Sequence, residues 1–195
     1  MPKYAVTLLL PCKGDDCTHA QMLRRDAEDV VFCTEIIPNR RYGEALKWGL
    51  RRTTMPLVAT MDTDGQHTIE DLRRLLHWRH LHNSPMVIGQ RTPQWTPRGT
   101  ATRLLNLAAS ILAGQEVPDF GSGLRVFDTA IAKELVLPDG FDFNAALTMG
   151  FLAAGHQVQW LPITVQQRQW GHSFVQVADG FITLRTLWQT RPRST

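Results

Sequence analysis

Runs of apolar residues alternate with amphipathic segments along the first half of the chain. Near-continuous apolar runs predict strands that are covered on both faces, and they lie at 4–11, 29–37, 56–62 and 85–91. Segments with helical periodicity separate these runs, at 18–27, 42–52 and 68–82. In the last of them Ile69, Leu72 and Leu76 share one face, and Thr68 with Asp71 resembles a capping box. The β-α-β-α-β-α-β order predicts an α/β fold, in which helices cover both faces of a single, mainly parallel, Rossmann-like sheet.

The second half of the chain is less regular but continues with both kinds of element. We expect helices at 101–114, 146–155 and 174–188, and strands at 122–127 and 156–163. Neither an internal repeat nor a linker interrupts the pattern, and 195 residues is the size of one domain. The prediction is therefore a single domain over residues 1–195.

Composition narrows the classes of protein to consider. The chain is 43% hydrophobic and 20% charged, which is typical of a globular protein. Its net charge is only +3, and basic residues with interleaved aromatics do not form a dense run, so we expect no nucleic-acid partner. Cys12, Cys17 and Cys33 are odd in number and lack C-x-x-C spacing, which predicts free thiols in a reducing compartment, the cytoplasm.

Membrane contact is expected to be peripheral. The apolar stretch at the N-terminus is too short for a signal peptide, and no segment reaches the roughly 18 apolar residues of a spanning helix. The segment 180–195, "GFITLRTLWQTRPRST", combines apolar and aromatic residues with arginines, as interfacial helices do. Core packing explains the same pattern, as it does for "LLNLAASILAG" at 104–114.

Two carboxylates follow the third predicted strand, in "MDTDGQH" at residues 61–67. Ligands of open α/β sheets bind beyond the carboxyl ends of the strands, where Asp62 and Asp64 are expected. An i, i+2 pair of carboxylates can turn towards one cation, and the Gln66 amide can supply a third oxygen. Oxygen donors of this kind suit Mg²⁺ or Mn²⁺. An Asx-type turn is the alternative, and the D-x-D pattern alone does not decide between them.

The surroundings of this motif resemble one family. "MDTDGQHTIEDLRRLL" looks like the "D-x-D-G-Q-H-x-x-E-D" segment of family-2 glycosyltransferases, in the dolichyl-phosphate mannose synthase-like, polyprenyl-phosphate branch. In the family's order, "NRRYGEALKWGL" resembles "N-R-G-Y-G-x-A-L-x-x-G", "MVIGQR" resembles "V-V-I-G-S-R", and "DFGSGLRVF" resembles "D-x-x-S-G-F-R-x-F". "FLAAGHQVQWLPITVQQRQWGHS" is similar to "A-x-x-x-G-x-x-V-x-E-V-P-I-x-x-x-x-R-x-x-G-x-S". The resemblance covers roughly residues 39–175.

This resemblance implies a GT-A fold and an enzyme. Its reaction would be the inverting transfer of a sugar from a UDP- or GDP-linked donor to a polyprenyl phosphate, assisted by Mg²⁺ or Mn²⁺. Such a glycosyltransferase would serve cell-envelope polysaccharide synthesis, at the inner face of the membrane. Acceptor phosphate is already a nucleophile at neutral pH, so the reaction requires no general base from the protein.

The resemblance also implies roles for individual residues. The metal ligands would be Asp62, Asp64 and Gln66, and the catalytic residues Asp64, Arg125 and Arg168. The substrate-binding residues would be Pro11, Asp16, Asp62, Arg91, Ser122 and Ser173. Each arginine also has a purely structural interpretation. Arg125 could pair with Asp119, and Arg91 and Arg168 could be surface charges.

The N-terminus departs from the family pattern. Members open with two βα units, ending "P-x-Y-N-E" and "D-D-G-S-x-D-x-T", that hold the base and ribose, and this chain has room for one. Matching "LLLPCKGDD" to the first gives Pro11, Asp15 and Asp16 counterparts, whereas matching "PCKGDDCT" to the second gives counterparts to Asp16 and Thr18.

Two further positions differ, since Arg41 replaces a glycine and Ala146 a frequent glutamate. These departures favour an alternative function, a weak or inert relative that acts as a binding or partner module. A homo-oligomer or a second chain could supply the absent unit. A nucleotidyltransferase-like enzyme is the third option, but it would need a glycine-rich phosphate loop, to which "PCKGDD" is a poor match.

Overall fold

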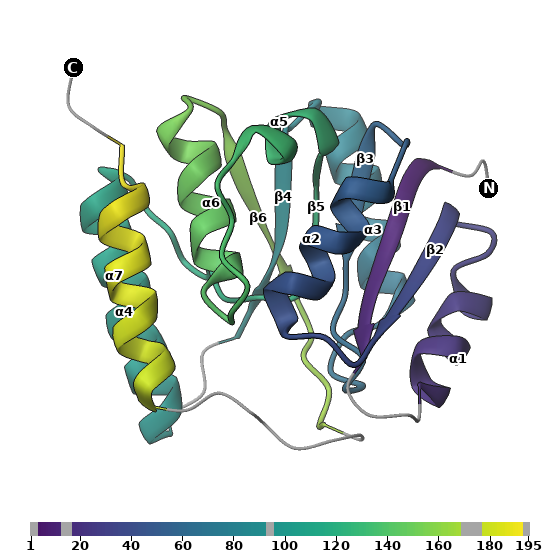
Figure 1. Cartoon of the computed structure of the whole chain (residues 1–195), viewed down its shortest axis with the longest axis horizontal. Coiled ribbons are helices and arrows are strands. Elements are labelled where there is room, and N and C mark those ends of the chain that lie inside the picture. Colours follow the sequence, from purple (N-terminus) through teal and green to yellow (C-terminus); the bar gives the residue numbers. More distant parts are fainter. Residues whose placement is uncertain (1–3, 13–16, 93–95, 169–176, 193–195) are drawn as a thin grey trace.

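The computed structural model describes residues 4–12, 17–92, 96–168 and 177–192 of the chain. These residues form a three-layer α/β fold around one six-stranded sheet with the order β2-β1-β3-β5-β4-β6 (Figure 1). The strands are β1 (Tyr4–Cys12), β2 (Val31–Pro38), β3 (Leu57–Thr60), β4 (Met86–Arg91), β5 (Arg125–Asp128) and β6 (Val158–Ile163). The α/β prediction is confirmed.

Helices cover both faces of the sheet, as the alternating pattern predicts. They are α1 (Thr18–Asp26), α2 (Tyr42–Arg52), α3 (Ile69–His82), α4 (Pro97–Ala113), α5 (Thr129–Glu134), α6 (Phe143–Ala153) and α7 (Val177–Thr190). Apolar side chains of α1 and α3 pack with one face of the sheet, and those of α2, α5 and α6 with the other. α4 and α7 lie together beyond α6, at one side of the molecule (Figure 1).

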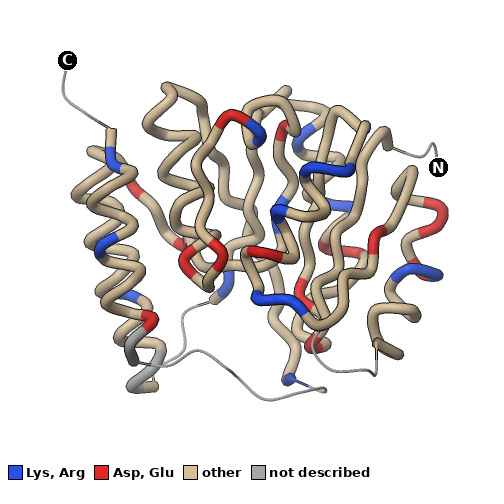
Figure 2. The backbone as a smooth tube through the Cα atoms, viewed as in Figure 1, with Lys and Arg blue, Asp and Glu red and all other residues tan. Residues whose placement is uncertain are grey.

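The sheet is parallel except for one strand. β5 pairs antiparallel with both β3 and β4, whereas the β1–β2, β1–β3 and β4–β6 pairs are parallel. The carboxyl ends of β1, β3, β4 and β6 therefore meet at the same edge of the sheet as the beginning of β5. This is the lower edge in Figure 1, where acidic and basic residues mix (Figure 2).

Local sequence signals explain where several helices begin. The Thr68 hydroxyl accepts from the Asp71 backbone N–H at 3.1 Å, which is the N-cap half of the predicted capping box, and it donates to the Asp71 carboxylate at 2.9 Å. α4 begins at Pro97, four residues before the predicted start, because the Thr96 hydroxyl accepts from Gly99 N at 3.0 Å. The short helix α5 was not predicted, and the predicted helix start at 174–176 lies outside the described residues.

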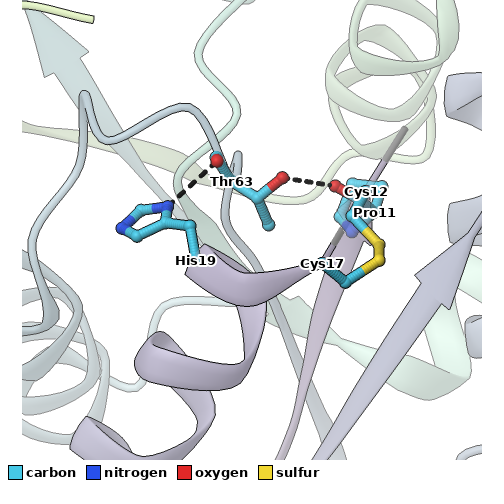
Figure 3. The surroundings of a disulfide bond; sticks show 5 residues. All are labelled: Pro11, Cys12, Cys17, His19 and Thr63. Carbon is cyan, nitrogen blue, oxygen red and sulfur yellow. Dashed lines mark hydrogen bonds between the residues drawn. A yellow bond between two sulfur atoms is a disulfide. The ribbon is translucent and has the colours of Figure 1, made fainter. Parts of the chain in front are cut away.

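The cysteines differ from the sequence-based prediction. Cys12, at the end of β1, and Cys17, just before α1, form a disulfide with a Cα–Cα distance of 5.9 Å (Figure 3). The prediction of free thiols is therefore wrong for these two residues and holds for Cys33. Spacing along the chain could not reveal the pair, because a disulfide depends on how the strand end and the helix start face each other.

Candidate active site

The edge of the sheet where the strand ends meet carries most of the predicted site. Asp62, Asp64 and Gln66 follow β3, Arg91 is the last residue of β4, and Arg168 comes five residues after β6. The antiparallel direction of β5 places Ser122 and Arg125 at the same edge, and Pro11 stands near the end of β1. Asp16 and Ser173 lie outside the described residues, so their predicted roles stay predictions.

The Asp62 carboxylate lies directly against the backbone of Gly123. A Cβ atom at position 123 would stand 2.1 Å from Asp62 Oδ2, so only glycine leaves room for this carboxylate. The Thr60 hydroxyl donates to the Gly123 carbonyl at 2.8 Å and holds the two segments together. The glycine of "SGLR" thus has a physical reason, which is the close approach of the first aspartate of the D-x-D pair.

A half-buried tyrosine and a buried histidine flank the same carboxylate. Tyr42 hydrogen-bonds to Asp62 and receives a hydrogen bond from Asn144 Nδ2 at 3.1 Å; burial, together with the Asp62 charge, raises its pKa. His67 Nε2 lies 3.9 Å from Asp62 Oδ2. Burial lowers the pKa of His67 despite the nearby carboxylates, so we assign it a neutral ring. Asp62 is therefore oriented by Tyr42 and His67 and by its packing against Gly123.

The second aspartate already holds a cationic group. Arg168 Nη2 lies 2.8 Å from Asp64 Oδ2 and donates to Gln66 Oε1 at 3.2 Å. The Gln66 backbone N–H donates to Asp64 Oδ1 at 3.0 Å, and Gln166 N donates to the Gln66 carbonyl at 3.0 Å. A guanidinium thus stands between two of the three predicted metal ligands. These oxygens fit a cation, although the described residues contain no group of three or more His, Cys, Asp or Glu side chains arranged for a metal.

Arg91 is fixed at this edge by an acidic partner that the sequence analysis did not include in the site. Arg91 Nε and Nη2 each donate to Asp119 at 2.8 Å, and the Arg91 backbone N–H donates to the same carboxylate at 3.1 Å. Burial disfavours the charge on Arg91, but the Asp119 hydrogen bonds and charge outweigh this and raise its pKa. Arg91 therefore presents a fixed, half-buried positive charge at the edge of the sheet that carries Asp62 and Asp64.

Arg125 is completely buried. Its guanidinium donates to the carbonyls of Phe120 and Ser122 in the preceding loop, and to the Asn144 carbonyl and Thr148 hydroxyl of α6. Burial lowers its pKa to about 10, which still leaves it charged at neutral pH. The structure does not give it the carboxylate partner Asp119, which pairs with Arg91 instead. Its contacts favour a positioning role for the loop at 120–123, so direct phosphate binding stays a prediction.

The remaining predicted residues occupy the same edge. Ser122 is fully buried, and no described residue partners its hydroxyl. Pro11 is half-buried, and its carbonyl accepts from the Thr63 hydroxyl at 2.9 Å. Sequence reasoning missed Tyr42, His67 and Gly123 as neighbours of Asp62, and Asp119 as the partner of Arg91. All four stand inside the motifs that carry the resemblance, which was the available signal.

Comparisons with known proteins support the class that this arrangement suggests. No protein-family model matches the chain. An undecaprenyl-phosphate mannosyltransferase from Micrococcus luteus is 31% identical over 146 residues, which cover 68% of this chain and 58% of that protein. A polyprenol monophosphomannose synthase from Mycolicibacterium smegmatis is 32% identical over 143 residues, 68% of this chain and 53% of that protein. The chain spans about half the length of these relatives.

Solved structures agree on the fold. Glucosyl-3-phosphoglycerate synthase from Mycobacterium tuberculosis, in complex with Mn²⁺, UDP-glucose and phosphoglyceric acid, superimposes with a TM-score of 0.72 at 14% identity. The match covers 95% of this chain and 79% of that one. The sheet, with paired carboxylates at its edge, defines a glycosyltransferase fold of the GT-A class. Within that class, the chain belongs to the family-2 glycosyltransferases, and the two relatives named above are polyprenyl-phosphate sugar transferases.

Proposed function

We propose that this chain transfers a sugar, with inversion, from a nucleotide diphosphate donor to a polyprenyl phosphate, using Mg²⁺ or Mn²⁺. The observation that carries the proposal is the cationic group held by Asp64 and Gln66 beside the oriented carboxylate of Asp62. The names of the two curated relatives support the lipid phosphate acceptor and a mannosyl group as the first sugar to test. Donor base and sugar are left to experiment, since the chain matches only about half of each relative.

Different residues at this edge would bind the cation, bind phosphate and position the loop at 120–123. Asp62, Asp64 and Gln66 would hold the cation, which when bound supplies positive charge that stabilises the departing nucleoside diphosphate. Arg168 and Arg91 donate to phosphate oxygens, since guanidinium groups form charge-assisted bonds with them. The acceptor phosphate oxygen forms the new bond to the anomeric carbon, while the bond to the donor diphosphate breaks and its electron pair leaves with that group. Arg125 positions the loop that carries Ser122 and Gly123.

Calorimetric titration with UDP- and GDP-linked sugars, with and without Mn²⁺, tests this function. We expect one nucleotide class to bind, and its affinity to rise at least roughly tenfold with Mn²⁺, because an ion held by Asp62, Asp64 and Gln66 would supply positive charge for the donor phosphates. Transfer to a short-chain polyprenyl phosphate then identifies the acceptor. If a folded sample binds none of these nucleotide sugars, the result contradicts the proposal and favours the non-catalytic binding module.

A hydrophobic face on α4 and α7 supports contact with the acceptor's membrane. Both helices begin at the edge of the sheet that carries the site (Figure 1). Their exposed apolar residues are Leu104, Leu107 and Ile111 on α4, and Phe181, Ile182, Leu184 and Trp188 on α7. The Arg191 guanidinium lies 3.6 Å from the Trp188 ring centroid, an aromatic-basic pair suited to an anionic interface. Within the described part of the chain, no helix is long and apolar enough to cross a bilayer.

Binding to vesicles tests this face. We expect the chain to sediment with phosphatidylglycerol vesicles, and the double variant Leu107→Glu with Phe181→Glu to bind at least about tenfold more weakly, because each charge replaces an apolar contact. Leu81→Glu is the matched control, since Leu81 is 62% exposed on α3, which packs against the sheet and not with α4 and α7. Equal binding of the double variant and the control would place any membrane contact elsewhere.

A further inference from the structure

The Cys12–Cys17 disulfide lies directly beside the D-x-D segment (Figure 3). It joins the end of β1 to the residue that precedes α1, where Cys17 occupies the N-cap position without a side-chain hydrogen bond to the helix. A serine, threonine or aspartate at this position would hold the helix start by capping it. Here the covalent bond to the strand holds it instead.

Both sides of this crosslink contact the same residue, Thr63, which is the middle residue of the D-x-D segment. On the strand side, the Thr63 hydroxyl donates to the carbonyl of Pro11, the neighbour of Cys12, at 2.9 Å. On the helix side, His19 Nδ1 lies 2.9 Å from the Thr63 carbonyl and donates to it. Thr63 is thereby held between the two segments that the disulfide joins, and its neighbours Asp62 and Asp64 are the carboxylates of the site.

We propose that Cys12 and Cys17 form a reversible dithiol–disulfide site that controls the geometry of the D-x-D segment. The reductant is a dithiol. Its thiolate attacks the sulfur of Cys17, because Cys17 is half-buried while Cys12 is only 7% exposed. The S–S bond breaks, and its electron pair leaves on the Cys12 sulfur. The second thiol then releases Cys17 and closes the reductant's own disulfide, so two protons and two electrons pass to the cysteines.

Reduction removes the covalent link that fixes α1 relative to β1. The His19 contact then depends on the packing of a nine-residue helix whose buried residues are Ala20 and Leu23. Thr63 then keeps its bond to Pro11 but loses a fixed position for its bond to His19. The side chains of Asp62 and Asp64 therefore sample a wider range of orientations. The reduced chain should therefore bind a divalent cation more weakly, a readout that rests on the proposed function.

The test compares oxidised and reduced protein in a Cys33→Ser background, which removes the remaining thiol. Thiol titration and intact mass should show no free thiols and a mass two hydrogens lower in the oxidised form. After dithiothreitol treatment and removal of the reagent, hydrogen exchange at residues 61–66 should rise. Mn²⁺ affinity should fall about fivefold, the scale of losing one hydrogen bond, and recover on reoxidation. The double variant Cys12→Ser with Cys17→Ser should show the hydrogen exchange and Mn²⁺ affinity of the reduced form, and dithiothreitol should change neither.

A second variant separates this proposal from the proposed function. His19→Ala removes the hydrogen bond to Thr63 and keeps the disulfide, so reduction should change exchange at residues 61–66 less than in the parent. If neither form binds Mn²⁺ but exchange still responds to reduction, the redox coupling stands and the proposed metal function fails. Two free thiols that resist oxidation by glutathione disulfide, or identical exchange in both forms, would overturn the redox site.

Discussion

Asp64→Asn should abolish the Mn²⁺-dependent part of nucleotide-sugar binding and leave the fold intact. Asparagine keeps an oxygen for the Gln66 backbone N–H, which donates to Asp64 Oδ1 at 3.0 Å, but removes the charge that now faces Arg168. We expect affinity with Mn²⁺ to fall at least roughly tenfold, to the value without the ion, because the variant lacks one of the two carboxylate charges that would hold the cation. Calorimetry on the variant measures the loss, and unchanged circular dichroism establishes that the chain is folded.

Asp128→Asn is the matched control for this substitution. Asp128 also pairs with an arginine, since Arg79 Nη2 lies 2.6 Å from its Oδ1, but it ends β5 at the opposite edge of the sheet. Its replacement should leave nucleotide-sugar affinity within about twofold of the parent, because this pair stands at the edge of the sheet away from the site. Equal affinities of the Asp64 and Asp128 variants would remove Asp64 from the metal site.

Arg125→Leu should lower the free energy of unfolding by about 3 kcal/mol or more. The substitution leaves the carbonyls of Phe120, Ser122 and Asn144 without their buried donor, and each unsatisfied buried acceptor is costly. Urea denaturation followed by tryptophan fluorescence measures this loss. The expected result identifies Arg125 as a residue that positions the loop at 120–123.

Arg168→Leu provides the contrasting variant. Arg168 is exposed, so its loss should change the free energy of unfolding by less than about 1 kcal/mol. Catalysis should suffer in this variant, because Arg168 is the guanidinium nearest the two predicted metal ligands. An Arg125 variant of normal stability that loses only affinity for the acceptor phosphate would restore the direct role that the resemblance implies.

The fold was largely predictable because the apolar runs and the segments with helical periodicity indicate the same order of strands and helices. The apolar runs at 4–11, 56–62 and 85–91 are central strands, and the periodic segments between them are the helices that cover the sheet. The direction of β5 was not predictable from its four residues, since a strand this short carries no pattern that sets its direction in the sheet. That direction nevertheless decides that the loop before Arg125 reaches the site.

The site was predictable in position and less so in contacts. Motif order brought Asp62, Asp64 and Arg91 to one edge of the sheet, as parallel topology requires. Burial and partners depend on tertiary packing, which a motif does not encode. The partner of Asp119 is one example. Asp119 binds Arg91 and not Arg125, and Arg125 donates to backbone carbonyls instead. The link between Cys12 and Cys17 is another, because it needs two backbones at the correct distance.

On the proposed function, the position of Arg168 would link the binding of the divalent ion to the binding of the acceptor phosphate. A divalent ion that takes Asp64 and Gln66 must first displace this guanidinium, so its measured affinity is that of an exchange between two cations. A phosphate that draws Arg168 away leaves the same oxygens unoccupied and strengthens metal binding. Linkage makes the effect reciprocal: the ion must strengthen phosphate binding by the same factor. On the proposed function, the lipid acceptor and the metal would therefore bind cooperatively through Arg168.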